Sequence, residues 1–266
     1  MIDATLRDRF RRDGVVFLPG ALDARTQAMG LAAWRWSIAH PSPRAARLYE
    51  TVLERAPGAE AARALPSTEP GFFYQDLGNP DALSVYGQII RRPAITRVLA
   101  ALFDHGAGGS PQAWFTGEQV FLKEEGSPPT GWHQDISDMP AEGEDMAVIW
   151  MSFEAVPREG ALEVVRGSHR GPVYSSIYGL YRSQPIPDVG SRRAEFDIVG
   201  FACRPGDIVV FHPAMLHGGG PTGPGARRRS TALRFYGEDC WFTPRARLRD
   251  GGPRQPYRRP EFARVL

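Results

Sequence analysis

The chain has 266 residues, 42% hydrophobic and 11% aromatic, which is enough to bury a core without disulfide staples. Its 32 basic and 30 acidic residues give a net charge of +2, so we expect no nucleic-acid binding through overall charge. Two cysteines, an N-terminus without a signal-peptide pattern and no apolar run of membrane-spanning length predict a cytoplasmic protein without membrane attachment.

The first hundred residues are predicted to be mainly helical. Asp23 is a good helix cap, and Pro93 interrupts an apolar pattern of helical spacing. A short apolar run that closes on Pro19-Gly20 is typical of a strand followed by a turn. The expected elements are a helix over residues 4–12, a strand over 14–20, and helices over 23–40, 43–55 and 81–103.

From about residue 114 the pattern changes to short apolar strands separated by glycine, proline and aspartate. These strands are expected over residues 119–123, 146–153, 161–165, 207–211 and 230–236. Because they are short and no helices stand between them, they favour an antiparallel jelly roll over a parallel α/β sheet. We therefore predict a mainly β fold with flanking helices: a double-stranded β-helix (cupin-like jelly roll) with an N-terminal helical layer.

No internal repeat or linker divides the chain, so we predict one domain over residues 1–266. Its parts are a helix-rich region, a jelly-roll core and a basic tail, at residues 1–105, about 114–243 and 244–266. The tail carries seven arginines without an aromatic platform, which we interpret as a solvated segment rather than a nucleic-acid site. Two irregular segments, 136–145 and 171–193, are candidates for lids.

A histidine and a carboxylate stand two residues apart, at His133 and Asp135. This spacing places both side chains on one face of a strand, where they can act as neighbouring metal ligands. Taken alone, the pair is equally compatible with an ordinary hydrogen-bonded couple at a strand end. A facial triad for iron(II) requires a third ligand from elsewhere in the fold.

His217 is the best candidate for this third ligand. It follows a predicted strand and precedes three glycines, small residues that let a ligand approach closely. His212 is the competitor, but it lies directly before Pro213 at the end of that strand. His169 is expected to stabilise a turn.

An iron site of this kind can take 2-oxoglutarate, whose distal carboxylate suits the planar fork of an arginine. Arg228 stands eleven residues beyond His217. Period-two alternation places Arg228, Ser230 and Arg234 on one face of a strand and Arg229 on the other. The sequence does not settle which face looks inward, so Arg229 is the alternative anchor; solvation of all three arginines at a strand edge is the third interpretation.

At this point the chain resembles the phytanoyl-CoA dioxygenase-like branch of the iron(II)/2-oxoglutarate oxygenases. The resemblance includes the opening "F-x-x-x-G-hydrophobic" strand and a segment similar to "G-x-L-x-V-x-P-G-S-H". It covers most of the chain. The matching segments are Phe10–Gly20, Gln119–Lys123 with Trp132–Asp135, Val148–Phe153, Glu159–His169, and Gly206 through His217 to Arg228.

The resemblance implies specific roles for residues of this chain. The iron ligands would be His133, Asp135 and His217, and the co-substrate anchor would be Arg228. Two further side chains, Gln119 and Trp150, would lie beside 2-oxoglutarate.

The chain departs from the family pattern at two positions. Arg166 replaces a turn proline. Gly219 replaces a residue whose hydroxyl often helps to hold the co-substrate, and that hydroxyl could come from Ser230 or Thr222 instead.

We therefore expect a dioxygenase that uses Fe(II), 2-oxoglutarate and O₂ to hydroxylate an unactivated C–H bond, releasing succinate and CO₂. The expected substrate is a small molecule of secondary-metabolite type. Irregular segments contain aromatic residues that could line a pocket or pack in the core: Phe72, Phe73, Tyr74, Tyr174, Tyr178 and Tyr181.

Several alternatives stay open at this stage. The same oxidant could give desaturation, epimerisation or ring formation, or the jelly roll could be a non-catalytic binding module. A zinc hydrolase is less favoured, because no general base is identifiable. The carboxylate at Asp135 disfavours halogenation, for which related enzymes carry a small residue there.

Overall fold

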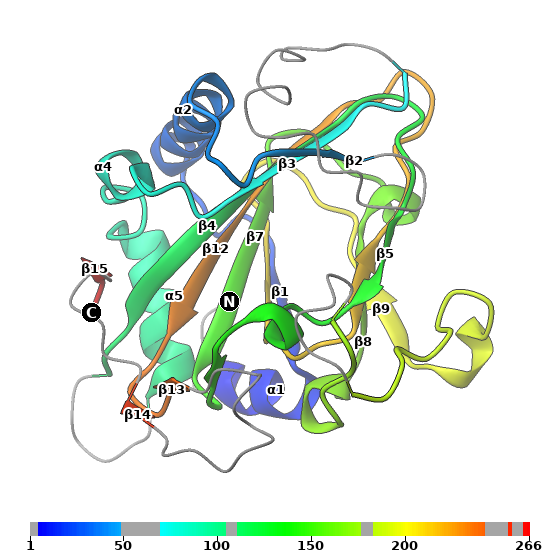
Figure 1. The fold of residues 1–266 in the computed structure, drawn as a ribbon. Coiled ribbons are helices and arrows are strands. Elements are labelled where there is room, and N and C mark those ends of the chain that lie inside the picture. The colour runs from blue at the N-terminus through cyan, green and yellow to red at the C-terminus, as the bar shows by residue number, and fades with distance from the viewer. Residues whose placement is uncertain (1–4, 49–69, 105–110, 177–182, 243–254, 257–262) are drawn as a thin grey trace.

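The protein is an antiparallel β structure with helices on one side (Figure 1). The computed structural model describes residues 5–48, 70–104, 111–176, 183–242, 255–256 and 263–266. Its large sheet has eight strands, and β15 (Ala263–Arg264) pairs with β4 outside the main path. The other seven are, in spatial order, β1 (Val15–Leu18), β10 (Ile208–Phe211), β7 (Met146–Ser152), β12 (Arg228–Tyr236), β4 (Trp114–Lys123), β3 (Phe73–Leu77) and β2 (Ala46–Leu48).

A second sheet faces the large one across the interior of the jelly roll (Figure 1). Its strands, in spatial order, are β5 (Thr130–His133), β11 (His217–Gly219), β8 (Leu162–Val165) and β9 (Ile198–Gly200). A third, smaller sheet contains β14 (Gln255–Pro256), β13 (Trp241–Phe242) and β6 (Ala141–Glu142). Short 3₁₀ turns are η1 (Asp135–Asp138), η2 (Arg158–Gly160), η3 (Ser168–Arg170) and η4 (Arg193–Glu195).

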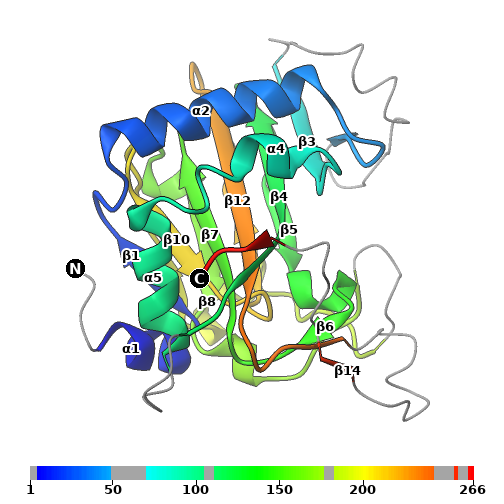
Figure 2. The same ribbon diagram turned by 90° about the vertical axis from the view of Figure 1, so that its left-hand side faces the viewer.

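The helices begin and end where local chemistry allows. The carboxylate of Asp23 accepts the backbone N–H of Thr26 at 2.6 Å and caps the longest helix, and Pro93 lies in the first turn of the last one. Figure 2 shows helices lying across the outer face of the large sheet. The helices are α1 (Leu6–Asp13), α2 (Ala24–Ala39), α4 (Ala82–Tyr86) and α5 (Pro93–Phe103).

The large sheet is covered on both faces, and β12 shows how the two faces differ. Leu233 and Phe235 belong to the main apolar core, which includes residues of the helices. Ala232 belongs to a separate cluster with Trp150 and Val164, which lies between the two sheets. Because side chains alternate along a strand, the face with Ala232 also carries the residues two and four positions away.

The predicted fold class is confirmed: the chain is mainly β, with an antiparallel jelly-roll core and helices on the outside of the large sheet. All five strands expected after residue 114 are present; β4 and β12 are longer than expected, and the other three are one residue shorter. The N-terminal region is less purely helical than expected, since it also contributes β1, β2 and β3 to the large sheet.

The helix expected over residues 43–55 is wrong at residues 46–48, which form β2 and pair antiparallel with β3; residues 49–55 lie outside the described part of the chain. The pairing gives backbone hydrogen bonds that outweigh a weak helical preference.

Of the aromatic residues that could line a pocket or pack in the core, Phe72 and Tyr74 pack in the main core. Tyr174 packs beside a small apolar cluster, while Tyr178 and Tyr181 lie outside the described residues.

Several other features were expected from the sequence. Cys203 and Cys240 are both buried and unpaired. Most of the predicted basic tail falls outside the described residues.

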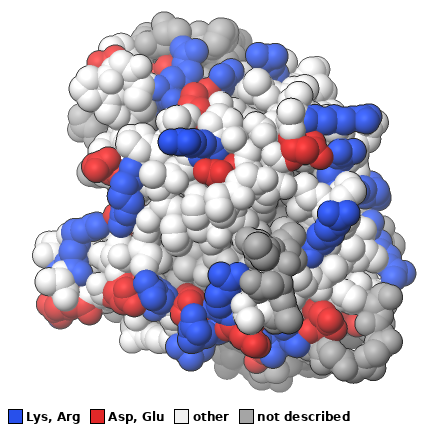
Figure 3. All heavy atoms as spheres, turned by 180° about the vertical axis from the view of Figure 1, so that it is seen from behind, with Lys and Arg blue, Asp and Glu red and all other residues white. Residues whose placement is uncertain are grey.

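On the face seen in Figure 3, basic and acidic side chains are interspersed around a largely uncharged centre. Among the described helices, none combines the length and the apolar character that a membrane span requires.

The glycines after His217 predict a stability difference that can be measured. A Cβ on Gly220 would lie 2.0 Å from the backbone oxygen of Glu159, whereas one on Gly219 would meet nothing closer than 3.5 Å. We expect Gly220→Ala to lower the free energy of unfolding by about 2–4 kcal/mol and Gly219→Ala to change it by less than about 1 kcal/mol. Urea unfolding of both variants tests this, and equal losses would contradict it.

Candidate metal centre

The first two candidate ligands lie where β5 passes into η1. The strand ends at His133, and the extended backbone at Gln134 turns Asp135 back to the same side. Gln134 points the other way and is 1% exposed; its amide donates to the backbone oxygen of Ala214 at 2.7 Å. Its side-chain oxygen accepts the backbone N–H of Tyr174 at 2.8 Å. Gln134 therefore fixes the turn from behind while its neighbours face the interior.

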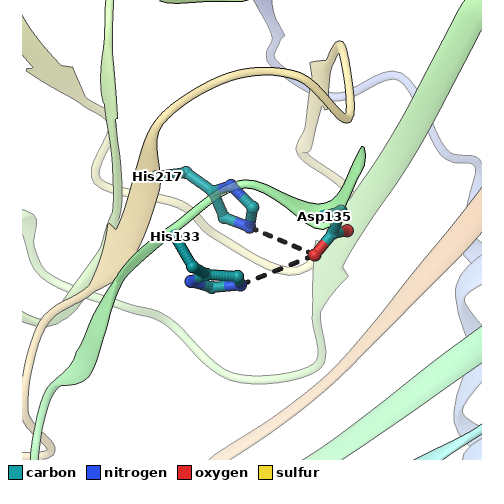
Figure 4. Close-up of side chains that lie close together, drawn as sticks. All are labelled: His133, Asp135 and His217. Carbon is teal, nitrogen blue, oxygen red and sulfur yellow. Dashed lines mark ion pairs between the residues drawn. The ribbon is translucent and has the colours of Figure 1, made fainter. Parts of the chain in front are cut away.

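The third candidate, His217, begins β11 and pairs directly with His133 in the second sheet. The two imidazole rings lie 4.1 Å apart between centroids. Both rings point their Nε2 atoms at Oδ1 of Asp135, at 3.5 Å from His133 and 3.7 Å from His217 (Figure 4). One ligand atom from each residue lies within 4.8 Å of the other two, so the three can hold a metal ion.

The backbone sets which imidazole nitrogen is available. Nδ1 of His133 lies 2.8 Å from the backbone oxygen of Gly131, and Nδ1 of His217 lies 3.0 Å from that of Met215. A carbonyl oxygen can only accept, so each Nδ1 carries a proton and each Nε2 keeps its lone pair. Two imidazoles and one carboxylate on one side of an ion form the donor set typical of non-haem iron(II) sites.

Arg234 fixes the carboxylate of this cluster, a contact that our reading of the sequence missed. Its Nη2 lies 2.9 Å from Oδ2 of Asp135 and also donates to Oε1 of Gln119. Arg234 is 8% exposed, so solvent screens the ion pair little. The ion pair with Arg234 occupies Oδ2 of Asp135, so Oδ1 is the oxygen that faces the two histidines. The sequence placed Arg234 on the same face as Arg228 but did not indicate its partner.

Burial and neighbouring charges set the protonation of the cluster. Burial and the proximity of His133 lower the pKa of His217 to about 4, so His217 is neutral near pH 7. Burial acts to lower the pKa of His133, but the hydrogen bond and charge of Asp135 raise it above its ordinary value. For Asp135, burial is outweighed by Arg234 and the two histidines, and its pKa is far below the ordinary value. The carboxylate is therefore ionised and ready to bind a cation.

The structure separates the two candidate anchors. Arg228 is 8% exposed and on the face of β12 that carries Ala232, between the sheets. Arg229 is on the opposite face, where its Nε donates to Glu154 and its guanidinium lies 5.6 Å from the ring centre of Trp34. Arg228, and not Arg229, therefore faces the interior that contains the histidines.

The other predicted site residues occupy the same inward face. Ser230 is 1% exposed. Ala232 pairs with Gln119 on the neighbouring strand β4 and with Trp150 on the other neighbour, β7. Gln119 also donates to the side-chain oxygen of Gln75 at 3.1 Å. Thr222, the other possible source of a hydroxyl, hydrogen-bonds through its backbone to the turn at residues 126–127, and its buried Oγ1 has no partner among the described residues.

The competing histidines lie outside the cluster. Nδ1 of His212 accepts the backbone N–H of Ala214 at 3.1 Å, and its Nε2 lies 3.2 Å from the backbone oxygen of Gly143. His169 lies in η3, where its Nε2 is 3.0 Å from the backbone oxygen of Arg11. Both therefore hold segments together, as expected for His169.

Comparison with known proteins gives a consistent result. Residues 10–230 match the family model described as phytanoyl-CoA dioxygenase (PhyH). Human peroxisomal phytanoyl-CoA dioxygenase is 28% identical over 118 residues, which are 41% of this chain and 34% of that protein. A Stutzerimonas stutzeri protein described as a probable alpha-ketoglutarate-dependent hypophosphite dioxygenase is 27% identical over 48% of this chain and 49% of its own. The match spans about a third to a half of these relatives' length.

Solved structures with the same fold cover nearly the whole chain. The epimerase SnoN, in complex with Fe³⁺, alpha ketoglutarate and nogalamycin RO, superposes with a TM-score of 0.69 at 23% identity, over 98% of this chain and 97% of that one. The carbocyclase SnoK from nogalamycin biosynthesis gives a TM-score of 0.68 at 17% identity, over 99% and 96%. At these identities the likeness establishes the fold.

The contact between Arg234 and Asp135 predicts an effect on metal affinity. Arg234→Gln leaves Oδ2 of Asp135 without its cation, so the affinity for Fe(II) should fall about 10- to 100-fold. Arg229→Gln is the matched control, because it removes an arginine from the other face of the same strand. Anaerobic Fe(II) titration of the two variants measures the difference, and an equal loss in both would refute the role of Arg234.

His212 predicts a dependence of stability on pH. Burial, with the charge of His169 second, lowers its pKa from 6.5 to about 4. Between these pH values the unfolded chain binds a proton that the folded chain does not, so stability falls as pH drops from 6.5 towards 4. In the metal-free protein this loss should be on the order of 3 kcal/mol.

Urea unfolding of wild type and His212→Gln at pH 7 and pH 4.5 isolates this contribution. The variant should lose less stability than wild type on acidification. Parallel losses would mean that His212 is not the group that titrates.

Proposed function

The chain belongs to the phytanoyl-CoA dioxygenase family of iron- and 2-oxoglutarate-dependent oxygenases, and we propose that it hydroxylates an unactivated C–H bond of a small molecule. The observation that carries the proposal is the cluster of half-buried His133 and Asp135 with buried His217, together with Arg228 in the same interior. Membership of the family confirms the predicted class of cofactors, Fe(II) with 2-oxoglutarate.

Under this proposal the residues of the chain have distinct tasks. The two histidines and Asp135 would hold the iron, with Arg234 keeping the carboxylate in place. Arg228 would bind the distal carboxylate of 2-oxoglutarate. Its guanidinium faces the interior beside Gly219, which is two residues beyond His217. Ser230, Gln119 and Trp150, on the same inward face, would lie beside the co-substrate.

The bound iron, with 2-oxoglutarate and O₂, supplies an oxidant strong enough to break a C–H bond. In the overall reaction one oxygen atom enters succinate and the other enters the product, with release of CO₂. The protein's contribution is to orient the co-substrate and exclude water. The near-complete burial of Arg228, which is 8% exposed, suits that task because charge–charge contacts strengthen where water is excluded.

The solved structures of similar fold support the proposed substrate class. SnoN was solved with nogalamycin RO, a small molecule, and it and SnoK act in nogalamycin biosynthesis. This supports a secondary-metabolite-type substrate for the present chain. The same comparison favours a second candidate reaction, epimerisation or carbocyclisation, because an epimerase and a carbocyclase are among the neighbours that cover nearly the whole chain.

Anaerobic titration with Fe(II) and then 2-oxoglutarate tests the proposal through the visible metal-to-ligand charge-transfer band. The wild type should develop the band, Asp135→Ala should lose metal binding, and Arg228→Ala should need at least tenfold more 2-oxoglutarate. Arg229→Ala is the control and should behave as wild type. Absence of the band in metal-replete wild type would refute an oxygenase and favour a binding module.

Mass spectrometry of turned-over substrate then separates the candidate reactions. Hydroxylation adds one oxygen atom, ring closure removes two hydrogen atoms, and epimerisation leaves the mass unchanged. Stoichiometric succinate with a product one oxygen heavier would support hydroxylation.

A further inference from the structure

Two cationic side chains are buried side by side without an anionic partner. Lys123 on β4 is the direct cross-strand partner of Arg228 on β12, and they are 0% and 8% exposed. Within the described residues neither forms an ion pair. Burying one unpaired charge is costly, and two of the same sign repel each other as well. The ring of Phe73, whose centre lies 4.1 Å from Nζ of Lys123, offsets part of this cost, and an anion bound beside the pair would offset more.

The hydrogen-bonding groups around this pair are only partly used. Nζ of Lys123 donates to the backbone oxygen of Pro128 at 2.8 Å and to Oγ1 of Thr130 at 3.0 Å. Since an ammonium can only donate, Thr130 is the acceptor, and its own hydroxyl proton has no acceptor among the described residues. Nη1 of Arg228 donates to the backbone oxygen of Gly160, but its buried Nε has no partner in that part of the chain.

Open space lies between these groups at Gly219. Gly219 on β11 pairs with Thr130 on β5. A Cβ on Gly219 would lie 3.5 Å from Nη2 of Arg228 and 3.5 Å from Oγ1 of Thr130. The missing side chain thus leaves room for a ligand atom between a guanidinium and a hydroxyl, two residues beyond His217.

We propose that Thr130 and Lys123 join Arg228 in binding the distal carboxylate of 2-oxoglutarate. Thr130 donates its hydroxyl to the carboxylate. Lys123 is a positioning residue, which fixes that hydroxyl by donating to it and adds a second positive charge. This inference rests on the proposed function and deepens it, because it explains why the site would select an oxo acid with a second carboxylate. Neither Ser230 nor Thr222 is then needed as the source of the hydroxyl.

The protonation of Lys123 depends on what binds beside it. Burial, with the charge of Arg228 second, holds the pKa of Lys123 well below its ordinary value. An anion in the space beside Gly219 would reverse the effect of Arg228. A purely structural Lys123 would instead brace the turn through Pro128 and Thr130, and its replacement would then change stability without changing the preference among oxo acids.

The test compares two oxo acids on the metal-loaded protein. With Fe(II) bound under anaerobic conditions, 2-oxoglutarate and 2-oxobutanoate, which lacks the distal carboxylate, are titrated against each variant. Lys123→Met and Thr130→Val should each raise the dissociation constant of 2-oxoglutarate about tenfold or more and leave that of 2-oxobutanoate unchanged. Thr231→Val, a buried threonine on the helix side of β12, is the matched control and should change neither.

Two further variants sharpen the test of Thr130. Thr130→Ser keeps the hydroxyl and removes only a methyl group, so it should bind 2-oxoglutarate about as tightly as wild type. Gly219→Ala places a Cβ 3.5 Å from Nη2 of Arg228, in the space proposed for the carboxylate, and should weaken 2-oxoglutarate binding. Loss of affinity in Thr130→Ser, or unchanged affinity in Gly219→Ala, would contradict the proposed position of the carboxylate.

The outcomes distinguish this inference from the proposed function. If wild type binds 2-oxoglutarate, and Arg228→Ala weakens it, but Lys123→Met and Thr130→Val do not, the inference is refuted and the proposed function stands. Equal weakening of both oxo acids in these variants would also refute it, by pointing to a disturbed metal site. If metal-loaded wild type binds neither oxo acid, both are refuted.

Discussion

The antiparallel pairing of β5 with β11 is the constraint on which the candidate site depends. It joins two segments far apart in the sequence and sets the rings of His133 and His217 4.1 Å apart. The pairing requires small residues after His217: a Cβ on Gly218 would lie 2.9 Å from the backbone oxygen of Thr130, and one on Gly220 would meet that of Glu159 at 2.0 Å. The glycines therefore act on the metal site through the backbone, by letting the strand sit close enough to its neighbours.

The interior of the jelly roll holds its charges in an uneven arrangement. At one end Asp135 is paired with Arg234 and faces the Nε2 atoms of two histidines. At the other end Arg228 and Lys123 lie side by side without a counter-ion among the described residues. Such an arrangement costs stability in the empty protein and suits a ligand that chelates a metal at one end and carries a negative charge at the other. 2-Oxoglutarate has that form, which is why the charge pattern supports the proposed co-substrate.

The sequence predicted those parts of the site that follow from local rules. His133 and Asp135 are two residues apart on one strand, and spacing alone places them together. His217 was indicated by the glycines beside it. Arg234, Lys123 and Thr130 were missed because their partners are set by register between strands, which no local pattern reveals. The failure at β2 has the same origin, since its strand form depends on the exposed edge of β3.

The choice between Arg228 and Arg229 was left open for a different reason. Alternation of polar and apolar residues marks the buried face of a strand only if the other face is solvated. β12 is covered by helices on one side and by the second sheet on the other, so nearly every residue along it is buried. In such a strand the more polar face should look towards the site, because apolar helices offer no partners for charge.

By that rule Arg228, Ser230 and Arg234 face inward, while Leu233 and Phe235 face the helices, as the structure has them. Arg229 is tolerated on the helix side because it lies near the start of the strand, where Glu154 reaches it. Once both faces of a strand are known to be covered, its charged residues identify the functional face, whereas its apolar residues identify only the packing.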